Sequence, residues 1–307
     1  MMIPINPLVY IDMNNSLTGK LTHLLFRDVH YDFWNVGLIR GGVNQLLSDS
    51  HYNIRWYKHR SSASYLADPF IISRDNKEFV FVEEYDYATK KGHLSVIYDW
   101  NKPPRKIIDE PYHLSYPFLI EEDGTLYMIP EASAGGKIYY YTCQKFPYEW
   151  RKEGMLIEEA ILDPTIFKHN GKFWMFYTKP AQSCSELHLR YSDTLLGEWK
   201  EHSGNPVKVA SKTCRPAGPV FEVNDALYRP SQDSTGNYGD NIIINRITEL
   251  STSTYREEPV NVITPKNDYP YTGMHHIAHT PGMLVIDGRK TLREFKGLGA
   301  ILKSLMR

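Results

Sequence analysis

Side chains that could do chemistry recur at fixed offsets from a series of tight turns in this 307-residue chain. The turns begin, in chain order, at Asp75, Asp123, Asn170, Asn224 and Pro281. Seven residues before each turn stand Asp68, Tyr116, Asp163, Ala217 and Met274, and eight residues after it stand Glu83, Glu131, Thr178, Gln232 and Arg289. Because the side chains of a strand alternate between its faces, equal offsets place these residues on equivalent faces. The pattern predicts one site that is built from residues far apart in the sequence.

The repeated unit is a Pro-containing segment that leads through a tight turn into a second β-rich run. Successive turns are separated by 48, 47, 54 and 57 residues, close to the period of about 40 to 50 residues that propeller blades show. The runs GHLSVIYDW, KIYYYTCQ, ELHLRYS and DNIIINRITEL follow the second runs as third strands. We therefore expect an all-β, five-bladed propeller in which the first strand of each blade lines the central channel.

The two ends of the sequence differ in what they add to the repeats. FWNVGLIRG and NIRWYKH near the start supply two strands that the fifth repeat lacks, and pairing them with it would close the ring and remove an exposed edge. The propeller is thus expected over residues 1–289. Residues 290–307, KTLREFKGLGAILKSLMR, predict a short basic amphipathic C-terminal helix. Such a helix either packs across the propeller or lies on an anionic membrane surface.

The composition is that of one soluble β domain with a neutral charge balance. A net charge of −1 and a pI near 6.9 argue against nucleic acid as a partner. The 22 Tyr and 6 Trp either fill the space between sheets or stack on sugar rings. Three cysteines without metal-ligand spacing favour a reducing compartment, and no apolar run is long enough to span a bilayer. We expect a cytoplasmic protein, either free or peripheral at the inner membrane face.

Several short motifs carry a resemblance to known families. ADPF, FVEEYDY, EPYHLSYPF, MIPEAS, YSDTLLGEW, RPAGP, YRPSQD and YREE stand in the repeats over roughly residues 30–290. The pattern resembles the five-bladed propellers of glycoside hydrolase families 43 and 32. More specifically, the motifs together resemble the propeller domain at the N-terminus of plant glucosamine inositolphosphorylceramide transferase and its relatives in bacterial surface-polysaccharide gene clusters. The resemblance implies a carbohydrate-active protein of surface-glycan biosynthesis.

Family 43 implies roles for two of the repeated acids. Asp68 matches the base of the first blade, and Asp163 matches the aspartate that orients and tunes the general acid. The general acid itself is a Glu in a Glu-Gly-Pro setting, where this chain has Ala217. An inverting hydrolase needs both carboxyl groups, because an alkoxide leaves slowly without a proton.

The missing acid leaves several alternatives. Glu131 or Asp233 could donate the proton in its place. A phosphate or nucleoside diphosphate could instead leave without protonation if cations stabilise its charge, and Arg215 and Arg229 are placed for that task. The same arginines could also pair with Asp163, Glu131 or Asp233 as a structural network.

Other polar residues in the repeats are candidates for contacts to sugar hydroxyls. They are Glu84, His113, Tyr116, Gln232 and His276. Because Glu83 and Glu84 are adjacent on one strand, only one of them can face the channel, and Glu84 is the residue we assign to the site. His275, His276 and His279 stand in one short extended segment, whose side chains point to alternate faces, so they are not expected to share a zinc ion and no metal is predicted. No P-loop or dinucleotide-binding motif is present, and no cofactor is expected.

Three functions are compatible with this sequence. The first is glycosyl transfer from an activated or lipid-linked sugar, with catalytic roles for Asp68, Asp163 and Glu131. The second is hydrolysis of a glycoside with a relocated general acid. The third is glycan binding without catalysis. The expected partner in each case is a carbohydrate or sugar phosphate, with membrane contact through residues 290–307 as an additional expectation.

Overall fold

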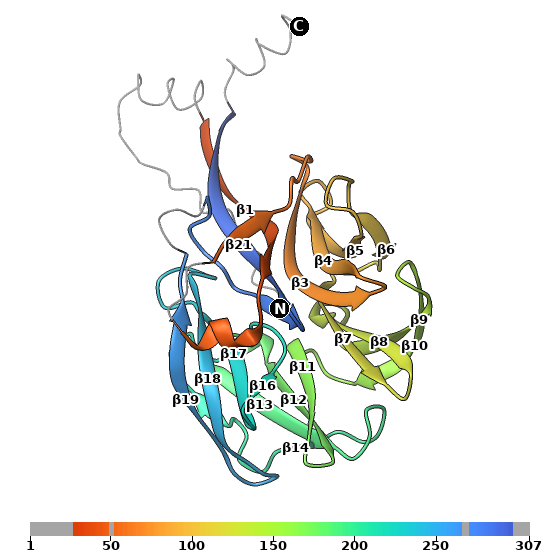
Figure 1. Ribbon diagram of the computed structural model, residues 1–307, viewed down its shortest axis with the longest axis vertical. Helices are drawn as coiled ribbons and strands as arrows, with labels where there is room; N and C mark the ends of the chain where they lie inside the picture. The colour runs from red at the N-terminus through yellow and green to blue at the C-terminus, as the bar shows by residue number, and fades with distance from the viewer. Residues whose placement is uncertain (1–26, 49–51, 266–269, 297–307) are drawn as a thin grey trace, which may run out of the picture.

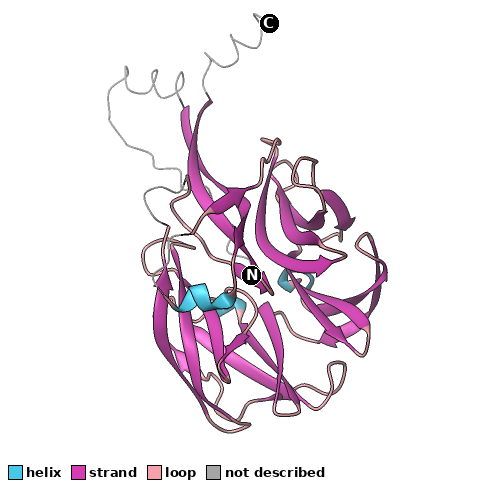
Figure 2. Cartoon of the chain, in the orientation of Figure 1, coloured by secondary structure: helices cyan, strands magenta, loops and turns pink. Residues whose placement is uncertain are grey.

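A computed structural model describes residues 27–48, 52–265 and 270–296, which form antiparallel sheets arranged around a central channel (Figure 1). Five sheets are present, and each is one blade of a propeller. Figure 2 shows that strands and loops make up almost the whole of this part, with only short 3-10 helices. These are η1 (Val43–Leu47), η2 (Ser133–Gly135) and η3 (Pro180–Gln182). The predicted all-β, five-bladed fold is confirmed.

Four blades are continuous in the sequence. Blade 1 contains β3 (Ser64–Arg74), β4 (Lys77–Asp86), β5 (Lys91–Ile97) and β6 (Arg105–Ile108). Blade 2 contains β7 (Ser115–Glu122), β8 (Thr125–Glu131), β9 (Ile138–Lys145) and β10 (Glu149–Ile157). Blade 3 contains β11 (Leu162–His169), β12 (Lys172–Thr178), β13 (Glu186–Ser192), β14 (Lys200–Glu201) and β15 (Lys208–Val209). Blade 4 contains β16 (Phe221–Val223), β17 (Ala226–Asp233), β18 (Asn241–Leu250) and β19 (Tyr255–Ile263).

Blade 5 joins the two ends of the described chain. Its strand order is β2 (Ile54–Trp56), β1 (Arg27–Arg40), β21 (Met283–Lys296) and β20 (Ile277–Thr280). Strand β1 pairs with β21 along its whole length, from Arg27 opposite Lys296 to Arg40 opposite Met283. This pairing closes the ring with the N-terminal strands that the sequence predicted.

The same pairing corrects the prediction for the C-terminal segment. Residues 290–296, expected to begin a helix, are the last part of β21. Helical spacing of apolar residues is a local preference, and here the ladder of hydrogen bonds to β1 prevails over it. Residues 297–307, the remainder of the predicted helix, lie outside the described residues. No helix in the described part of the chain is long and apolar enough to cross a membrane.

The first strands of blades 1–3 share one distortion. Each has an irregular register with its second strand, and within it Asp68, Tyr116 and Asp163 take left-handed backbone angles, with φ of 50°, 46° and 50°. Each is followed by proline. Such bulges re-aim a side chain, here toward the channel. The predicted seven-residue offset is therefore confirmed in these three blades.

Blade 4 departs from that offset by one residue. The left-handed position before proline is Gly218, with φ of 128°, and a Cβ there would lie 1.8 Å from the Ile277 carbonyl oxygen. Glycine is required because the backbones of blades 4 and 5 approach so closely. Ala217 is fully buried in an apolar cluster with Met274 and Ile277. The seven-residue offset thus gives the left-handed position in blades 1–3 and misses it by one residue in blade 4.

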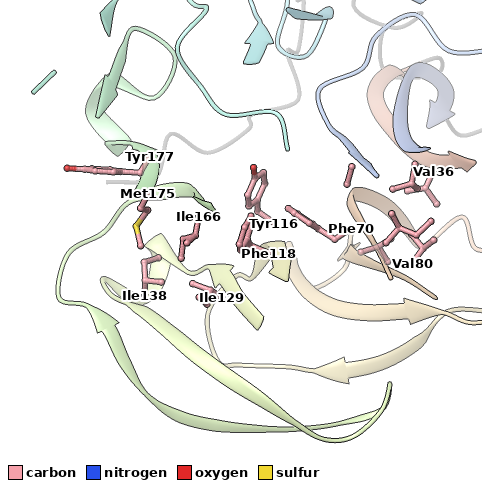
Figure 3. Packing of buried hydrophobic residues seen from close by; sticks show 14 of the residues in the cluster. Val36, Phe70, Val80, Tyr116, Phe118, Ile129, Ile138, Ile166, Met175 and Tyr177 are labelled. Atoms are coloured by element: carbon pink, nitrogen blue, oxygen red, sulfur yellow. The ribbon is translucent and has the colours of Figure 1, made fainter. Parts of the chain in front are cut away.

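The largest apolar cluster lies between the inner strands of blades 1–3 and blade 5. Figure 3 shows part of it, with Phe70, Tyr116, Phe118 and Ile166 side by side across three blades. Burial of each side chain of this size contributes about 1.5–3 kcal/mol to folding. This packing fixes the inner strands relative to one another and so fixes the positions of the residues at the channel.

Candidate functional site

One end of the channel, which we call the mouth, collects the left-handed residues of blades 1–3. Asp68 and Tyr116 are linked there, because the Tyr116 backbone N–H donates to Asp68 Oδ2 at 3.1 Å. The Tyr116 hydroxyl in turn lies 2.6 Å from Thr165 Oγ1 and accepts the Gly218 N–H at 3.1 Å. Non-glycine residues in this backbone region cost about 1–3 kcal/mol each and persist where the surrounding structure holds them. Three of them at one channel end point to a functional site.

The ends of the second strands supply the next layer, as the eight-residue offset predicted. Glu83, Glu131 and Thr178 pair with Ala67, Ser115 and Leu162, and each of these pairs spans 16 residues. Their side chains are buried at the mouth beside those of the first strands. The structure thus brings Glu131 to the site with Asp68 and Asp163.

Glu131 is held by two hydrogen-bond donors. The Ser115 hydroxyl donates to Oε2 at 2.8 Å, and the Ser133 backbone N–H donates to Oε1 at 2.6 Å. Both oxygens of the carboxylate are therefore occupied within blade 2.

Asp163 forms a buried ion pair with Arg215. Arg215 Nε lies 2.5 Å from Asp163 Oδ2, and the Gln232 amide reaches the same oxygen at 3.5 Å. Burial raises the pKa of Asp163, while the Arg215 guanidinium acts in the opposite direction. The sequence had left open whether Arg215 faces a phosphate or pairs with a carboxylate. In the structure it pairs with Asp163.

A histidine links two carboxylates on the other side of the mouth. His275 Nδ1 lies 2.6 Å from Asp287 Oδ2, and its Nε2 lies 3.3 Å from Asp68 Oδ1. Asp287 also accepts the backbone N–H groups of His275 and His276, at 2.9 and 3.0 Å. Burial raises the pKa of Asp68 to about 7, with Asp163 and Asp287 adding to the rise and His275 opposing it. Asp68 therefore titrates near neutral pH.

These groups also define where a metal ion could be held. The ligand atoms of Asp68, His275 and Asp287 lie within 4.8 Å of one another. The sequence had raised and set aside a different group, His275, His276 and His279. His279 lines the opposite end of the channel, so those three histidines do not meet. An imidazolium between two carboxylates already balances much of their charge.

Glu83 differs from the other carboxyl groups of the mouth. It is 5% exposed, and its buried Oε1 accepts no hydrogen bond from a described residue. His113 Nε2 is nearby, 3.6 Å from that oxygen. Burial and the neighbouring Asp68, Glu131 and Asp163 raise the pKa of Glu83 well above its usual range. The carboxyl group of Glu83 therefore keeps its proton to a higher pH than an ordinary glutamate does.

His276 lies at the centre of the channel below Asp68. Its ring packs against Phe70 and Tyr116, with centroid distances of 4.6 and 5.0 Å, and its Nδ1 lies 3.9 Å from Asp68 Oδ1. Burial lowers the pKa of His276 to about 3, so the ring is neutral. His276 is thus placed beside the site, beneath the carboxyl groups.

Three predicted site residues lie elsewhere. Glu84 faces away from Glu83 and accepts hydrogen bonds from Ser95 and Ser64 within blade 1. Glu83 therefore takes the channel position that we had assigned to Glu84. Asp233 accepts bonds from Thr235 N–H and Asn241 Nδ2 and stabilises its own loop.

Arg229 is the third of these residues. It is fully buried and forms a two-point ion pair with Glu257, at 2.8 and 2.6 Å, between β17 and β19. Arg229 does not lie at the mouth, and its expected role toward a phosphate group there is corrected. Alternation along β17 explains the placement of Arg229 and Asp233, because both lie an odd number of residues from Gln232, which faces the channel.

An aromatic rim that the sequence did not single out stands beside these residues. Tyr238, in the loop between β17 and β18, is 39% exposed. Its ring lies 5.6 Å from the Arg215 guanidinium carbon, and its centroid lies 5.3 Å from that of His275 and 6.3 Å from that of Trp34. An exposed aromatic face next to buried carboxyl groups can stack on the apolar face of a sugar ring.

The opposite end of the channel has a different character. A depression of about 410 Å³ lies there, near the hairpin turns, lined mostly by apolar residues of the inner strands such as Phe70, Ile72, Phe118 and Phe221. It contains none of the carboxyl groups of the mouth. This depression is therefore not where the chemistry-bearing side chains meet.

Comparisons with known proteins agree with this architecture at two levels. Solved structures share the fold at low sequence identity. One is a family 117 glycoside hydrolase from the marine bacterium Zobellia galactanivorans. It is 12% identical and superimposes with a TM-score of 0.53, over 85% of this chain and 90% of the hydrolase. A second is a family 43 β-xylosidase/α-arabinofuranosidase from a compost microbial metagenome. It is 15% identical and superimposes with a TM-score of 0.51, over 76% of this chain and 92% of the enzyme.

Curated relatives share the sequence as well. Glucosamine inositolphosphorylceramide transferase 1 from Oryza sativa subsp. indica is 32% identical over 231 residues, 70% of this chain and 31% of the relative. The Arabidopsis thaliana protein of that name is 31% identical over 209 residues, which are 64% of this chain and 27% of the relative. This chain thus spans about a third of the length of the curated relatives it matches. Residues 55–277 match the family model described as "Glucosamine inositolphosphorylceramide transferase 1, N-terminal", and the chain belongs to that family.

Proposed function

We propose that the protein binds carbohydrate at the channel mouth and makes or breaks a glycosidic bond there. The observation that carries this proposal is the convergence of Asp68, Glu83, Glu131 and Asp163, four buried carboxyl groups from three blades, at one channel end. Groups of carboxyls in different protonation states are what glycosidic chemistry requires. The names of the curated relatives, which are transferases, and of the solved structures, which are glycoside hydrolases, support the same substrate class.

Asp68 is the proposed base. Its Oδ2 accepts the Tyr116 N–H, and its Oδ1 faces His275, which Asp287 orients from behind. With a pKa of about 7, a large fraction of Asp68 is ionised at neutral pH and can still take up a proton. Asp68 would remove that proton from the hydroxyl group that attacks the sugar carbon.

The charges of the mouth favour a glycoside over a nucleotide sugar as substrate. A departing diphosphate needs free cations. In the described part of the chain Arg229 is committed to Glu257 and Arg215 to Asp163, and several carboxyl groups surround the latter pair. We therefore propose transfer between hydroxyl groups, with a sugar or alcohol as acceptor in keeping with the relatives' names. Surface-glycan biosynthesis and a cytoplasmic location stay predictions from the sequence.

Binding and turnover can be separated with one pair of variants. Nitrophenyl glycosides of N-acetylglucosamine, galactose, xylose and arabinose, with methanol or glycerol as acceptor, are the probes. Asp68→Asn should keep the affinity for an active glycoside and lower kcat by about 10²- to 10⁴-fold. Asp75→Asn, the same change at the exposed turn at the other end of that hairpin, should leave both unchanged.

Two results would contradict the proposal. One is stabilisation of the protein by nucleotide sugars together with none by any neutral glycoside. The other is binding of glycosides with no turnover by the native protein, which would assign the mouth to glycan binding alone.

A further inference from the structure

We propose that Glu83 is the proton donor to the leaving group, and hence that the substrate is a glycoside whose leaving group departs as an alcohol. This inference rests on the proposed function and adds to it a catalytic residue and a substrate class. It also fills the role for which the sequence offered Glu131 or Asp233.

Hydrogen bonding distinguishes Glu83 from its neighbours at the mouth. Asp163 has the Arg215 guanidinium, Glu131 has two donors from blade 2, and Asp287 has two backbone N–H groups as well as His275. Donors of this kind stabilise the carboxylate form. Each of these three carboxyl groups therefore has a partner that competes with its proton, and Glu83 Oε1 has none among the described residues.

Glu83 has the opposite surroundings. Its Oε1 is buried without a donor, and the acidic side chains of blades 1–3 lie around it. A buried carboxylate without a partner is costly, whereas a buried carboxylic acid is not. The protonated form is thus the stable one, which is the state that a general acid must have before reaction.

His113 is placed to stabilise the carboxylate that forms afterwards. Its Nδ1 accepts the Gly92 N–H at 2.9 Å, so in the neutral ring the hydrogen is carried by Nε2. That nitrogen lies 3.6 Å from Glu83 Oε1, just beyond hydrogen-bond distance. A small closing movement would let it donate to Glu83 once the proton has left.

The reaction balances with these two carboxyl groups. The proton of Glu83 moves to the glycosidic oxygen while the bond from that oxygen to the anomeric carbon breaks, and the alcohol leaves. The acceptor oxygen forms a new bond to the anomeric carbon, and its proton moves to Asp68. Glu83 then takes a proton from solvent and Asp68 releases one, which restores the starting state without oxidant or reductant.

Leaving-group dependence tests the inference, with Glu83→Gln as the variant and Glu84→Gln as its matched control on the other face of β4. A methyl glycoside needs the acid, whereas a 2,4-dinitrophenyl glycoside of the same sugar does not. Glu83→Gln should lose about 10²- to 10⁴-fold in kcat/KM on the first and less than about tenfold on the second. Glu84→Gln should lose little on either. An equal loss on both substrates, or a loss on neither, would overturn the inference.

Infrared spectroscopy provides a readout that does not depend on activity. At pH 8.5, where Asp68 is mostly ionised, the native protein should show the C=O stretch of a protonated carboxyl that Glu83→Gln removes and Glu84→Gln keeps. Absence of that band would overturn the inference even if the protein is active. If the band is present but no glycoside is turned over, the proposed function fails while the protonated state of Glu83 stands.

Discussion

Two buried groups of charged residues in this propeller follow opposite rules. In blade 4, Arg229 and Glu257 are matched. Each guanidinium nitrogen of Arg229 has an acceptor, and Glu257 also accepts hydrogen bonds from Lys208 Nζ at 2.7 Å and the Tyr255 hydroxyl at 2.5 Å. Burial alone would raise the pKa of Glu257, but Arg229 and Lys208 bring it to about 2. Buried charges that are completed in this way hold the outer strands of the blade in one arrangement.

At the mouth, by contrast, the buried acids outnumber the cations that pair with them. Its acids are Asp68, Glu83, Glu131, Asp163 and Asp287, and its paired cations among the described residues are Arg215 and His275. Acids without a cationic partner lower the stability of the fold, because some must stay protonated. The balanced charges of blade 4 therefore stabilise the fold, whereas the unbalanced acids of the mouth are suited to proton transfer.

Breaking the matched pair should give the largest change in stability. Arg229→Ala removes a guanidinium that is 0% exposed and leaves Glu257 buried, so the free energy of unfolding should fall by about 3–5 kcal/mol. Urea denaturation at pH 7 measures this. Replacing both residues, as Arg229→Met with Glu257→Leu, should recover most of the loss. A loss below about 1 kcal/mol in Arg229→Ala would show that the pair is not a structural one.

Crowding the mouth should have a smaller effect. A Cβ added at Gly92 would lie 2.5 Å from the Leu114 carbonyl oxygen and 2.7 Å from Glu83 Oε1. Gly92→Ala should therefore lower the free energy of unfolding by about 1–3 kcal/mol. Gly42→Ala is the control, because a Cβ there would meet nothing within 4 Å. Equal stability of the two variants by urea denaturation would mean that the backbone at Glu83 is not closely packed.

Removing the charge of Asp68 should give the smallest effect, and one that depends on pH. The pKa of Asp68 is raised in the folded state, so the folded protein binds more protons than the unfolded chain between about pH 4 and 7, and native stability falls as the pH rises through that window. Asp68→Asn avoids this loss. It should be more stable than the native protein at pH 8 by about 1 kcal/mol or more, with the difference gone at pH 4. Thermal denaturation at both pH values measures this stability difference. A difference that grows toward low pH would show that folding lowers the pKa of Asp68.

The repeat pattern predicted much of this molecule. The repeat period and the turn residues are local features of the sequence. They were enough to predict the five blades, ring closure by the N-terminal strands, and the shared face of Asp68, Tyr116 and Asp163. Glu131 and Gln232 followed from the same register. These residues sit in the blades whose turns are regular.

What escaped prediction depends on contacts between blades. The eight-residue offset pointed to Glu83, but both faces of a blade are buried, so alternation alone did not decide between Glu83 and Glu84. The partner of Arg229 stands two strands away, and the Asp287–His275 contact lies in the irregular fifth blade. Tyr238 belongs to a loop without a periodic pattern. In each case long-range packing, rather than a local preference, decides the outcome.

The pairing of β1 with β21 has a consequence for how the chain folds. Blades 1–4 can form in order as the polypeptide emerges, since their contacts are between neighbours in the sequence. The last blade cannot, because one of its central strands precedes the other four blades in the chain and the other follows them. Bringing them together carries a large loop-closure entropy, so ring closure is expected to be the late, rate-limiting event of folding. Until then two sheet edges stay open, and that is the stage at which chains of this protein are most prone to associate with one another.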